Sequence, residues 1–130
     1  MKKSLRRIAV AAAAATSVAV LLPGTAQAAQ WNTVSQTLNG TNWTTENYVR
    51  TVTTQGITIR LELNNLPGCC LDLRLKRSSD GQVFASKFNM NTLNVEYPIA
   101  TDVLADTRFI MEGRNTVSNT DRFWSGSLYY

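Results

Sequence analysis

The chain has 130 residues, of which 44% are hydrophobic and 17% are charged, with 13 Lys and Arg, 9 Asp and Glu, 2 Cys and no His. This length fits one domain, and the composition is that of a globular protein and not of a disordered one. The missing His excludes a Ser-His-Asp triad, a Cys-His catalytic pair and a His-ligated zinc site.

Residues 1–28 are predicted to be a secretory signal peptide. Four basic residues within the first seven form the n-region, and residues 8–22 form an apolar run. This run is too short for an ordinary helix across a bilayer of about 30 Å. A Pro-Gly pair ends the run, and Ala26 and Ala28 supply the small residues of a cleavage site. We therefore expect a bacterial protein that is secreted to the extracellular space, with cleavage after Ala28 and a mature domain of residues 29–130.

Removal of this segment leaves 102 residues and changes the charge of the protein. The segment holds four of the 13 basic residues and none of the 9 acidic ones, so the mature domain has nine of each and no net charge. Nucleic-acid-binding domains usually carry a basic stripe, and no basic run occurs beyond residues 74–77. We therefore expect no nucleic-acid partner. No later segment reaches transmembrane length, so no membrane partner is expected after cleavage.

Apolar and polar residues alternate along most of the mature chain, which is the pattern of half-buried strands. One such segment puts Leu93 and Val95 on its apolar face and Pro98 on its polar phase, where a strand end tolerates proline. Strands are predicted at residues 31–38, 48–54, 57–64, 71–76, 82–88, 93–99, 107–113 and 123–129.

Turn residues separate these segments. The pairs Asn39-Gly40, Gln55-Gly56 and Asp80-Gly81 fit tight turns, and residues 64–68 and 115–121 are predicted loops. No segment carries a helical stripe of apolar residues. Two sheets packed through their aliphatic faces account for the pattern, so we expect an all-β fold: a single β-sandwich or jelly roll of about eight antiparallel strands.

Five stretches follow the order of a known family: residues 47–52, 55–61, 71–75, 79–86 and 124–130. They resemble the pre-peptidase C-terminal domain of secreted bacterial proteases, a jelly roll of about this length. The resemblance implies a non-catalytic accessory module that helps a secreted enzyme reach insoluble substrate, in some members with calcium. Such domains often carry acidic residues at two places where this chain has Asn47 and Cys70.

Four carboxylates, those of Glu62, Asp72, Glu96 and Glu112, are predicted on outward strand faces. A glycosidase needs two carboxyl groups that converge in a cleft. Nothing local makes these four converge, so we expect solvated side chains and no catalytic site. If the strands of Glu62 and Arg74 pair as a hairpin, these two residues face each other as a cross-strand ion pair.

Asp102 and Asp106, together with Asp121 from another loop, supply hard oxygen ligands of the kind that calcium takes. Their spacing is not that of a known calcium loop, and the capping of turns by Asp side chains explains them as well. These three residues are therefore retained as candidate calcium ligands, and no other cofactor is expected.

Trp43 is the strongest candidate for ligand binding. Its neighbours Asn42, Thr44, Glu46 and Tyr48 add amide, hydroxyl, carboxylate and phenol groups. An aromatic ring flanked by such groups suits a sugar, with the ring face against C–H groups and the polar neighbours on the hydroxyls. The alternative is that Trp43 closes one end of the sandwich as a core residue.

Cys69 and Cys70 are adjacent, and persistent free thiols are unusual in an oxidising compartment. The Cα atoms of neighbours lie about 3.8 Å apart across a trans peptide, less than the roughly 4.4–6.8 Å of ordinary disulfides. Three states stay open. They are a disulfide between the neighbours, free thiols with Cys69 buried and Cys70 exposed, and a disulfide between two chains.

The sequence thus predicts a secreted, non-catalytic binding domain for an extracellular partner, such as a polysaccharide or a protein. One alternative is an inhibitor or interaction domain that acts on a secreted enzyme through the constrained loop of residues 66–70. Another is a structural secreted protein with no small ligand. A small hydrolase is the weakest interpretation, because no His is present to act as a base.

Overall fold

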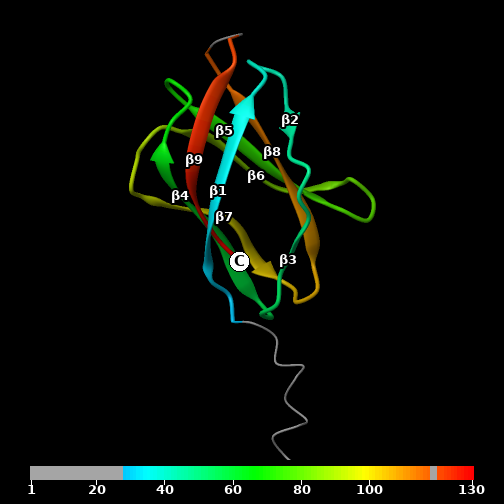
Figure 1. Ribbon diagram of the computed structural model, residues 1–130. Coiled ribbons are helices and arrows are strands. Elements are labelled where there is room, and N and C mark those ends of the chain that lie inside the picture. The colour runs from blue at the N-terminus through cyan, green and yellow to red at the C-terminus, as the bar shows by residue number, and fades with distance from the viewer. Residues whose placement is uncertain (1–27, 118–119) are drawn as a thin grey trace, which may run out of the picture.

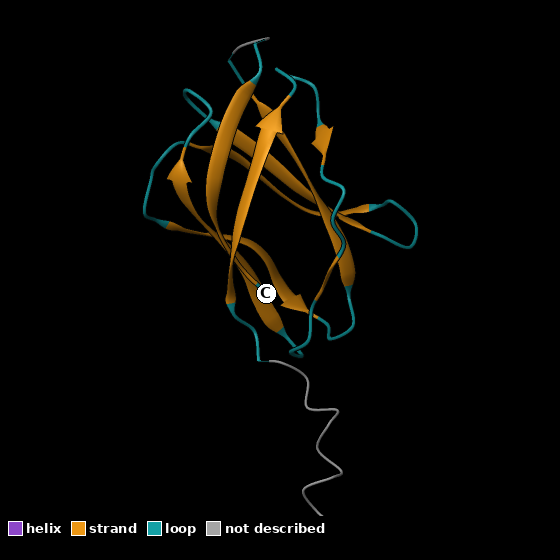
Figure 2. Ribbon diagram, viewed as in Figure 1, coloured by secondary structure: helices purple, strands orange, loops and turns teal. Residues whose placement is uncertain are grey.

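The computed structural model describes residues 28–117 and 120–130, so the predicted signal peptide lies outside the described residues except for Ala28. The described part folds into nine antiparallel strands without a helix (Figure 2). It therefore holds no helix long and apolar enough to cross a membrane. The strands are β1 (Trp31–Leu38), β2 (Thr44–Thr45), β3 (Arg50–Thr51), β4 (Ile57–Asn65), β5 (Leu71–Arg77), β6 (Val83–Met90), β7 (Glu96–Val103), β8 (Arg108–Asn115) and β9 (Arg122–Tyr129).

The strands form two sheets that pack face to face (Figure 1). One sheet has four strands in the order β1-β9-β4-β7. The other has the order β2-β8-β5-β6, and β3 also pairs with β8. If β2 and β3, which both pair with β8, are taken as one interrupted strand, eight strands remain with the connectivity of a jelly roll. The predicted all-β sandwich of about eight antiparallel strands is confirmed.

The inward side chains of the alternating strands make the core. Along β4, Ile57, Ile59, Leu61 and Leu63 are buried, while the residues between them stay partly exposed. Burial of such apolar surface stabilises the fold by about 25 cal/mol per Å². Trp124 and Leu128 on β9 extend the wall that β4 forms. The opposite wall comes from Leu71, Leu73 and Leu75 on β5 and from Phe109 and Met111 on β8.

The strand predicted at residues 93–99 begins later than expected. β7 starts at Glu96, and Leu93 and Val95 are exposed in the turn before it. Asn94 has a φ of 57° and donates its backbone N–H to the carbonyl of Leu63 at 2.9 Å. The prediction that Leu93 and Val95 belong to the apolar face of a strand is therefore wrong, because a left-handed residue between them forms the turn.

The strand predicted at residues 48–54 is also largely absent, since β3 contains only Arg50 and Thr51. The Glu46 carboxylate accepts the backbone N–H of Met111 on β8 at 2.8 Å, while the Glu46 N–H donates to the Met111 carbonyl at 3.1 Å. A side chain thus supplies a bond that a backbone carbonyl would supply in a continuous ladder. The chain consequently leaves the sheet between β2 and β3.

Candidate functional site

Trp43 lies beside the outward face of the five-stranded sheet. It precedes β2, whose residue Thr45 lies opposite Glu112 on β8. The guanidinium carbons of Arg74 and Arg114 lie 4.2 and 4.6 Å from the centre of the Trp43 ring. Guanidinium groups at this distance are attracted to the aromatic ring. The half-buried Trp43 is therefore neither a core residue nor a ring with both faces free for a sugar.

Buried carboxylates hold the two arginines near Trp43. Asp72 and Glu112 are only 3% exposed, so the prediction that both are solvated is wrong. Arg114 Nε contacts Asp72 at 2.9 Å, and Arg74 Nε contacts Glu112. The expected pair of Glu62 with Arg74 is also wrong, because their strands β4 and β5 lie in different sheets.

Glu112 accepts bonds from three side chains. Thr45 Oγ1 donates at 2.7 Å and Lys76 Nζ at 3.2 Å, in addition to Arg74. Burial acts to raise the pKa of Glu112, but these three hydrogen bonds outweigh it, and the pKa lies below the ordinary value. The carboxylate is thus a structural anion at neutral pH.

Two of the residues predicted to surround Trp43 form hydrogen bonds with residues that precede it in the chain. Thr44 Oγ1 accepts the N–H of Asn39 at 2.8 Å, and the Thr44 carbonyl accepts Gln36 Nε2 at 2.6 Å. Asn42 is exposed in the preceding turn, where its N–H donates to the Asn39 carbonyl. The two remaining residues of the predicted site, Glu46 and Tyr48, belong to a second cluster at the side of the sandwich.

This second cluster lines a trough along the side of the sandwich where β1 and β3 lie. Figure 1 shows the C-terminal end of the chain between the start of β1 and β3. Two adjoining cavities of about 250 and 280 Å³ share Asn32, Tyr48 and Tyr130 as lining residues. We call them together the Tyr48 trough, and its further lining residues in the mature domain are Gln30, Thr33, Arg50, Thr51 and Thr53. Ala28 also lines it but belongs to the predicted signal peptide.

Arg50 forms the back of the Tyr48 trough. It is 7% exposed, and its guanidinium carbon lies 4.8 Å from the centre of the Tyr48 ring and 5.9 Å from that of Tyr130. Its Nη1 contacts Glu46 Oε1, and its Nε is buried without a hydrogen-bond partner. The exposed Tyr48 ring is thus backed by a guanidinium group whose charge a carboxylate balances.

Burial raises the pKa of Glu46, while the Arg50 charge and the Met111 N–H act in the opposite direction. Burial likewise raises the pKa of Tyr130, so its phenol is neutral at neutral pH. Sequence reasoning found Tyr48 but missed Arg50, Asn32 and Tyr130. In the sequence, only their aromatic or polar character indicated a role in binding. They come from three separate segments of the chain, so local sequence does not show that they meet.

A larger cavity, of about 500 Å³, lies between the edge strands β6 and β7. Phe84, Ile99 and Val103 form its apolar part, and Asp102 and Arg77 line it as well. Arg77 also forms an ion pair with Asp80 at 3.2 Å. This cavity lacks an exposed aromatic ring, so its chemistry differs from that of the Tyr48 trough.

The three aspartates considered for calcium do not lie together. Asp102 and Asp106 border the turn from β7 to β8, whereas Asp121 precedes β9 at the other end of β8. An eight-residue strand separates these ends by about 25 Å. Within residues 28–117 and 120–130, no group of three or more His, Cys, Asp or Glu side chains could hold a metal ion.

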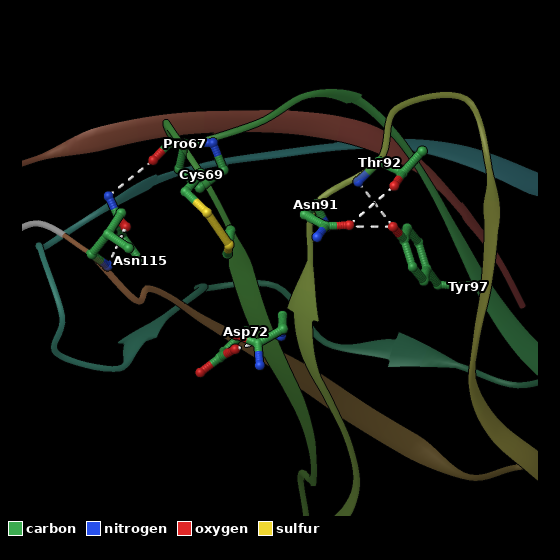
Figure 3. The surroundings of a disulfide bond; sticks show 10 residues. Pro67, Cys69, Asp72, Asn91, Thr92, Tyr97 and Asn115 are labelled. Carbon is green, nitrogen blue, oxygen red and sulfur yellow. Dashed lines mark hydrogen bonds between the residues drawn. A yellow bond between two sulfur atoms is a disulfide. The ribbon is translucent and has the colours of Figure 1, made fainter.

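Cys69 and Cys70 form a disulfide between neighbours, with a Cα–Cα distance of 3.7 Å (Figure 3). Cys69 is exposed and Cys70 is buried, the reverse of the arrangement expected for free thiols. The Asn115 side chain holds the loop by donating from Nδ2 to the Pro67 carbonyl at 2.9 Å. Pro67 is buried too, so the loop of residues 66–70 offers few side chains to an enzyme.

Comparison with protein-family models finds none that matches this chain, and neither the curated proteins nor the solved structures give a significant match.

Proposed function

We propose that this chain is a secreted, non-catalytic domain that binds carbohydrate in the Tyr48 trough. The observation that carries the proposal is the Tyr48 ring, which is 60% exposed and has the Arg50 guanidinium 4.8 Å from its centre. An exposed aromatic face receives the C–H face of a sugar ring. The fixed guanidinium limits the positions that the Tyr48 ring can take.

The polar lining of the trough supports a hydroxylated ligand. Gln30 and Asn32 contribute amides, and Thr33, Thr51 and Tyr130 contribute hydroxyls. Amides and hydroxyls both donate and accept hydrogen bonds, as sugar hydroxyls do. Small-molecule sites combine an apolar contact with a few convergent polar groups in this way.

The charge of the trough favours an uncharged sugar. Glu46 and Arg50 form an ion pair, so the cation that lines the trough has a carboxylate beside it. A second carboxylate, such as that of a uronic acid, would lie near Glu46 as well as near Arg50. Like charges at close range oppose binding in a partly desolvated site.

The rest of the proposed function follows from the sequence. The predicted signal peptide directs the domain outside the cell, where a disulfide such as Cys69–Cys70 persists. No His is available as a general base, which favours binding without catalysis. The proposed partner is thus an extracellular polysaccharide.

The proposal is tested by sedimentation of the mature protein with insoluble cellulose, chitin, xylan and cell-wall preparations. We expect retention by at least one uncharged polymer and loss of retention in Tyr48→Ala. Phe88→Ala is the matched control, because Phe88 is 53% exposed on β6, in the other sheet from β1. Equal retention of both variants, or retention by none of the polymers, would contradict the proposal.

A further inference from the structure

One lining residue of the Tyr48 trough, Thr33, belongs to the outward face of the four-stranded sheet. Along β1, Val34 and Leu38 point into the core, so the exposed Thr33, Ser35 and Thr37 point outward. Thr33 nevertheless lines the trough, together with Arg50 and Tyr48. Because β1 is an edge strand, a ligand in the trough can continue across this edge onto the sheet.

An aromatic pair stands on this face close to the trough. The rings of Trp31 and Tyr129, which lie opposite each other on β1 and β9, have their centres 5.4 Å apart. Arg60 on β4 places its guanidinium carbon 4.5 Å from the centre of the Tyr129 ring, and its Nη1 lies 3.0 Å from Glu96 Oε2. Trp31 is 41% exposed, so it keeps surface available to a ligand.

Hydroxyl groups follow along the same two strands. Thr33 lies opposite Ser127, and Ser35 lies opposite Ser125. The row ends at Phe123, which lies opposite Thr37 and is 50% exposed. We call the outward residues of β1 and β9 from the aromatic pair to Phe123 the hydroxyl stripe.

The hydroxyl stripe is long enough to bind a polymer, and its side chains are uncharged. From Tyr129 to Phe123 it spans seven residues of β9. The six steps between them cover roughly 20 Å at the rise of an antiparallel strand. The structure describes every outward position of β1 and β9 on this stripe, and none of them is charged. An uncharged row of hydroxyls between two aromatic ends suits several sugar rings in line.

We propose that a linear, uncharged polysaccharide binds along the hydroxyl stripe, entering from the Tyr48 trough and ending against Phe123. This inference rests on the proposed function and adds that the site binds several linked sugar units and not a single sugar. The observation behind it is the continuity of the two surfaces through Thr33. A protein partner fits less well, because the fully buried centre of a protein interface is apolar and this centre consists of Ser and Thr.

The test compares short and long ligands by isothermal titration calorimetry. The probes are cellobiose and cellohexaose, chitobiose and chitohexaose, and xylobiose and xylohexaose, each titrated into the mature protein. We expect one hexasaccharide to bind at least about tenfold more tightly than its disaccharide, because connected subsites add to each other. Equal affinity for the two lengths would overturn the inference.

Two variants locate the added subsites. Phe123→Ala removes the far ring, and Ser35→Arg places a large charged side chain in the middle of the stripe. Both should weaken binding of the hexasaccharide severalfold and leave the disaccharide unchanged, whereas Phe88→Ala should change neither. If both variants bind the hexasaccharide as the unmodified domain does, the stripe is not part of the site.

The outcomes for the trough and for the stripe are distinguishable. Tyr48→Ala should abolish binding of both lengths. If Tyr48→Ala abolishes binding but the stripe variants have no effect, the proposed function stands and the extended site is wrong. If no oligosaccharide binds to the unmodified domain, both proposals are wrong.

Discussion

Arg74 on β5 lies directly opposite Glu112 on β8, and the two side chains form an ion pair on the outward face of the five-stranded sheet. Asp72 and Arg114 repeat the pair two residues along, with the charges exchanged between the strands. Both carboxylates are buried although they point away from the core. The outward face of this sheet is thus covered locally by its own cationic side chains and by Trp43.

This arrangement predicts an acid-sensitive contribution from Glu112. Glu112→Gln should lower the free energy of unfolding at pH 7 by about 1–3 kcal/mol, the size of hydrogen bonds to charged groups. The pKa of Glu112 is lower in the folded state than its ordinary value of 4.5. The contribution is therefore complete above that ordinary value and is lost as the pH falls through the folded pKa.

Urea unfolding of both proteins at a series of pH values checks this prediction. The difference between the unmodified domain and Glu112→Gln should shrink as the pH is lowered below 4.5. With no His in the sequence, the stability of each protein should change little between about pH 6 and 8. A difference that persists unchanged into strong acid would contradict the role given to the Glu112 charge.

A second prediction concerns the core of the sandwich. Leu61 is fully buried, so Leu61→Ala should lower the free energy of unfolding by about 2–5 kcal/mol. Arg60, the preceding residue, points outward to an exposed ion pair, so Arg60→Ala should cost less than about 1 kcal/mol. Chemical denaturation of the two variants measures both values, and equal losses would show that the inward and outward phases of β4 are misassigned.

A third prediction concerns a close approach between strands. A Cβ atom added to Gly126 on β9 would overlap the Glu62 carbonyl oxygen, well inside van der Waals contact, and would lie 3.3 Å from the Leu63 Cα. These are backbone atoms, so Gly126→Ala should force β9 away from β4 and cost about 1–3 kcal/mol. Ser125→Ala serves as the control, because the side chain of Ser125 points outward. Equal melting temperatures for the two variants would contradict the close approach.

A fourth prediction concerns the disulfide between Cys69 and Cys70. Intact mass without reductant should show a monomer two hydrogens lighter than the reduced formula. Because the bond encloses almost no chain, reduction should lower the stability far less than the roughly 2–4 kcal/mol of ordinary disulfides. A monomer with the mass of the reduced formula, or a dimer that dissociates on reduction, would contradict the bond between neighbours.

Much of the fold could be predicted from the sequence, because burial on one face of a sheet imposes alternation. The segment Ile57–Asn65 shows this, since its aliphatic residues and its polar residues fall on opposite faces. The start of β7 could not be predicted, because Leu93 and Val95 continue the alternation through a turn. What ends the pattern is the backbone of Asn94, which binds the distant Leu63 carbonyl.

The candidate site could be predicted only in part. Tyr48 was found because it follows Trp43 in a polar segment, but local sequence does not reveal that Glu46 pairs with Met111 and splits that segment. The trough needs Asn32 from β1 and Tyr130 from the end of the chain. Such contacts depend on the order of strands in the sheets, and alternation alone does not determine that order.

Carbohydrate binding in the Tyr48 trough is tested most directly by an NMR titration. The probe is the soluble hexasaccharide of the polymer that retains the protein, added to labelled mature domain. We expect the largest amide shifts at Asn32, Thr33, Tyr48 and Arg50, with smaller shifts toward Phe123. Shifts that centre on Trp43 or on the cavity between β6 and β7, with the Tyr48 trough unaffected, would contradict it.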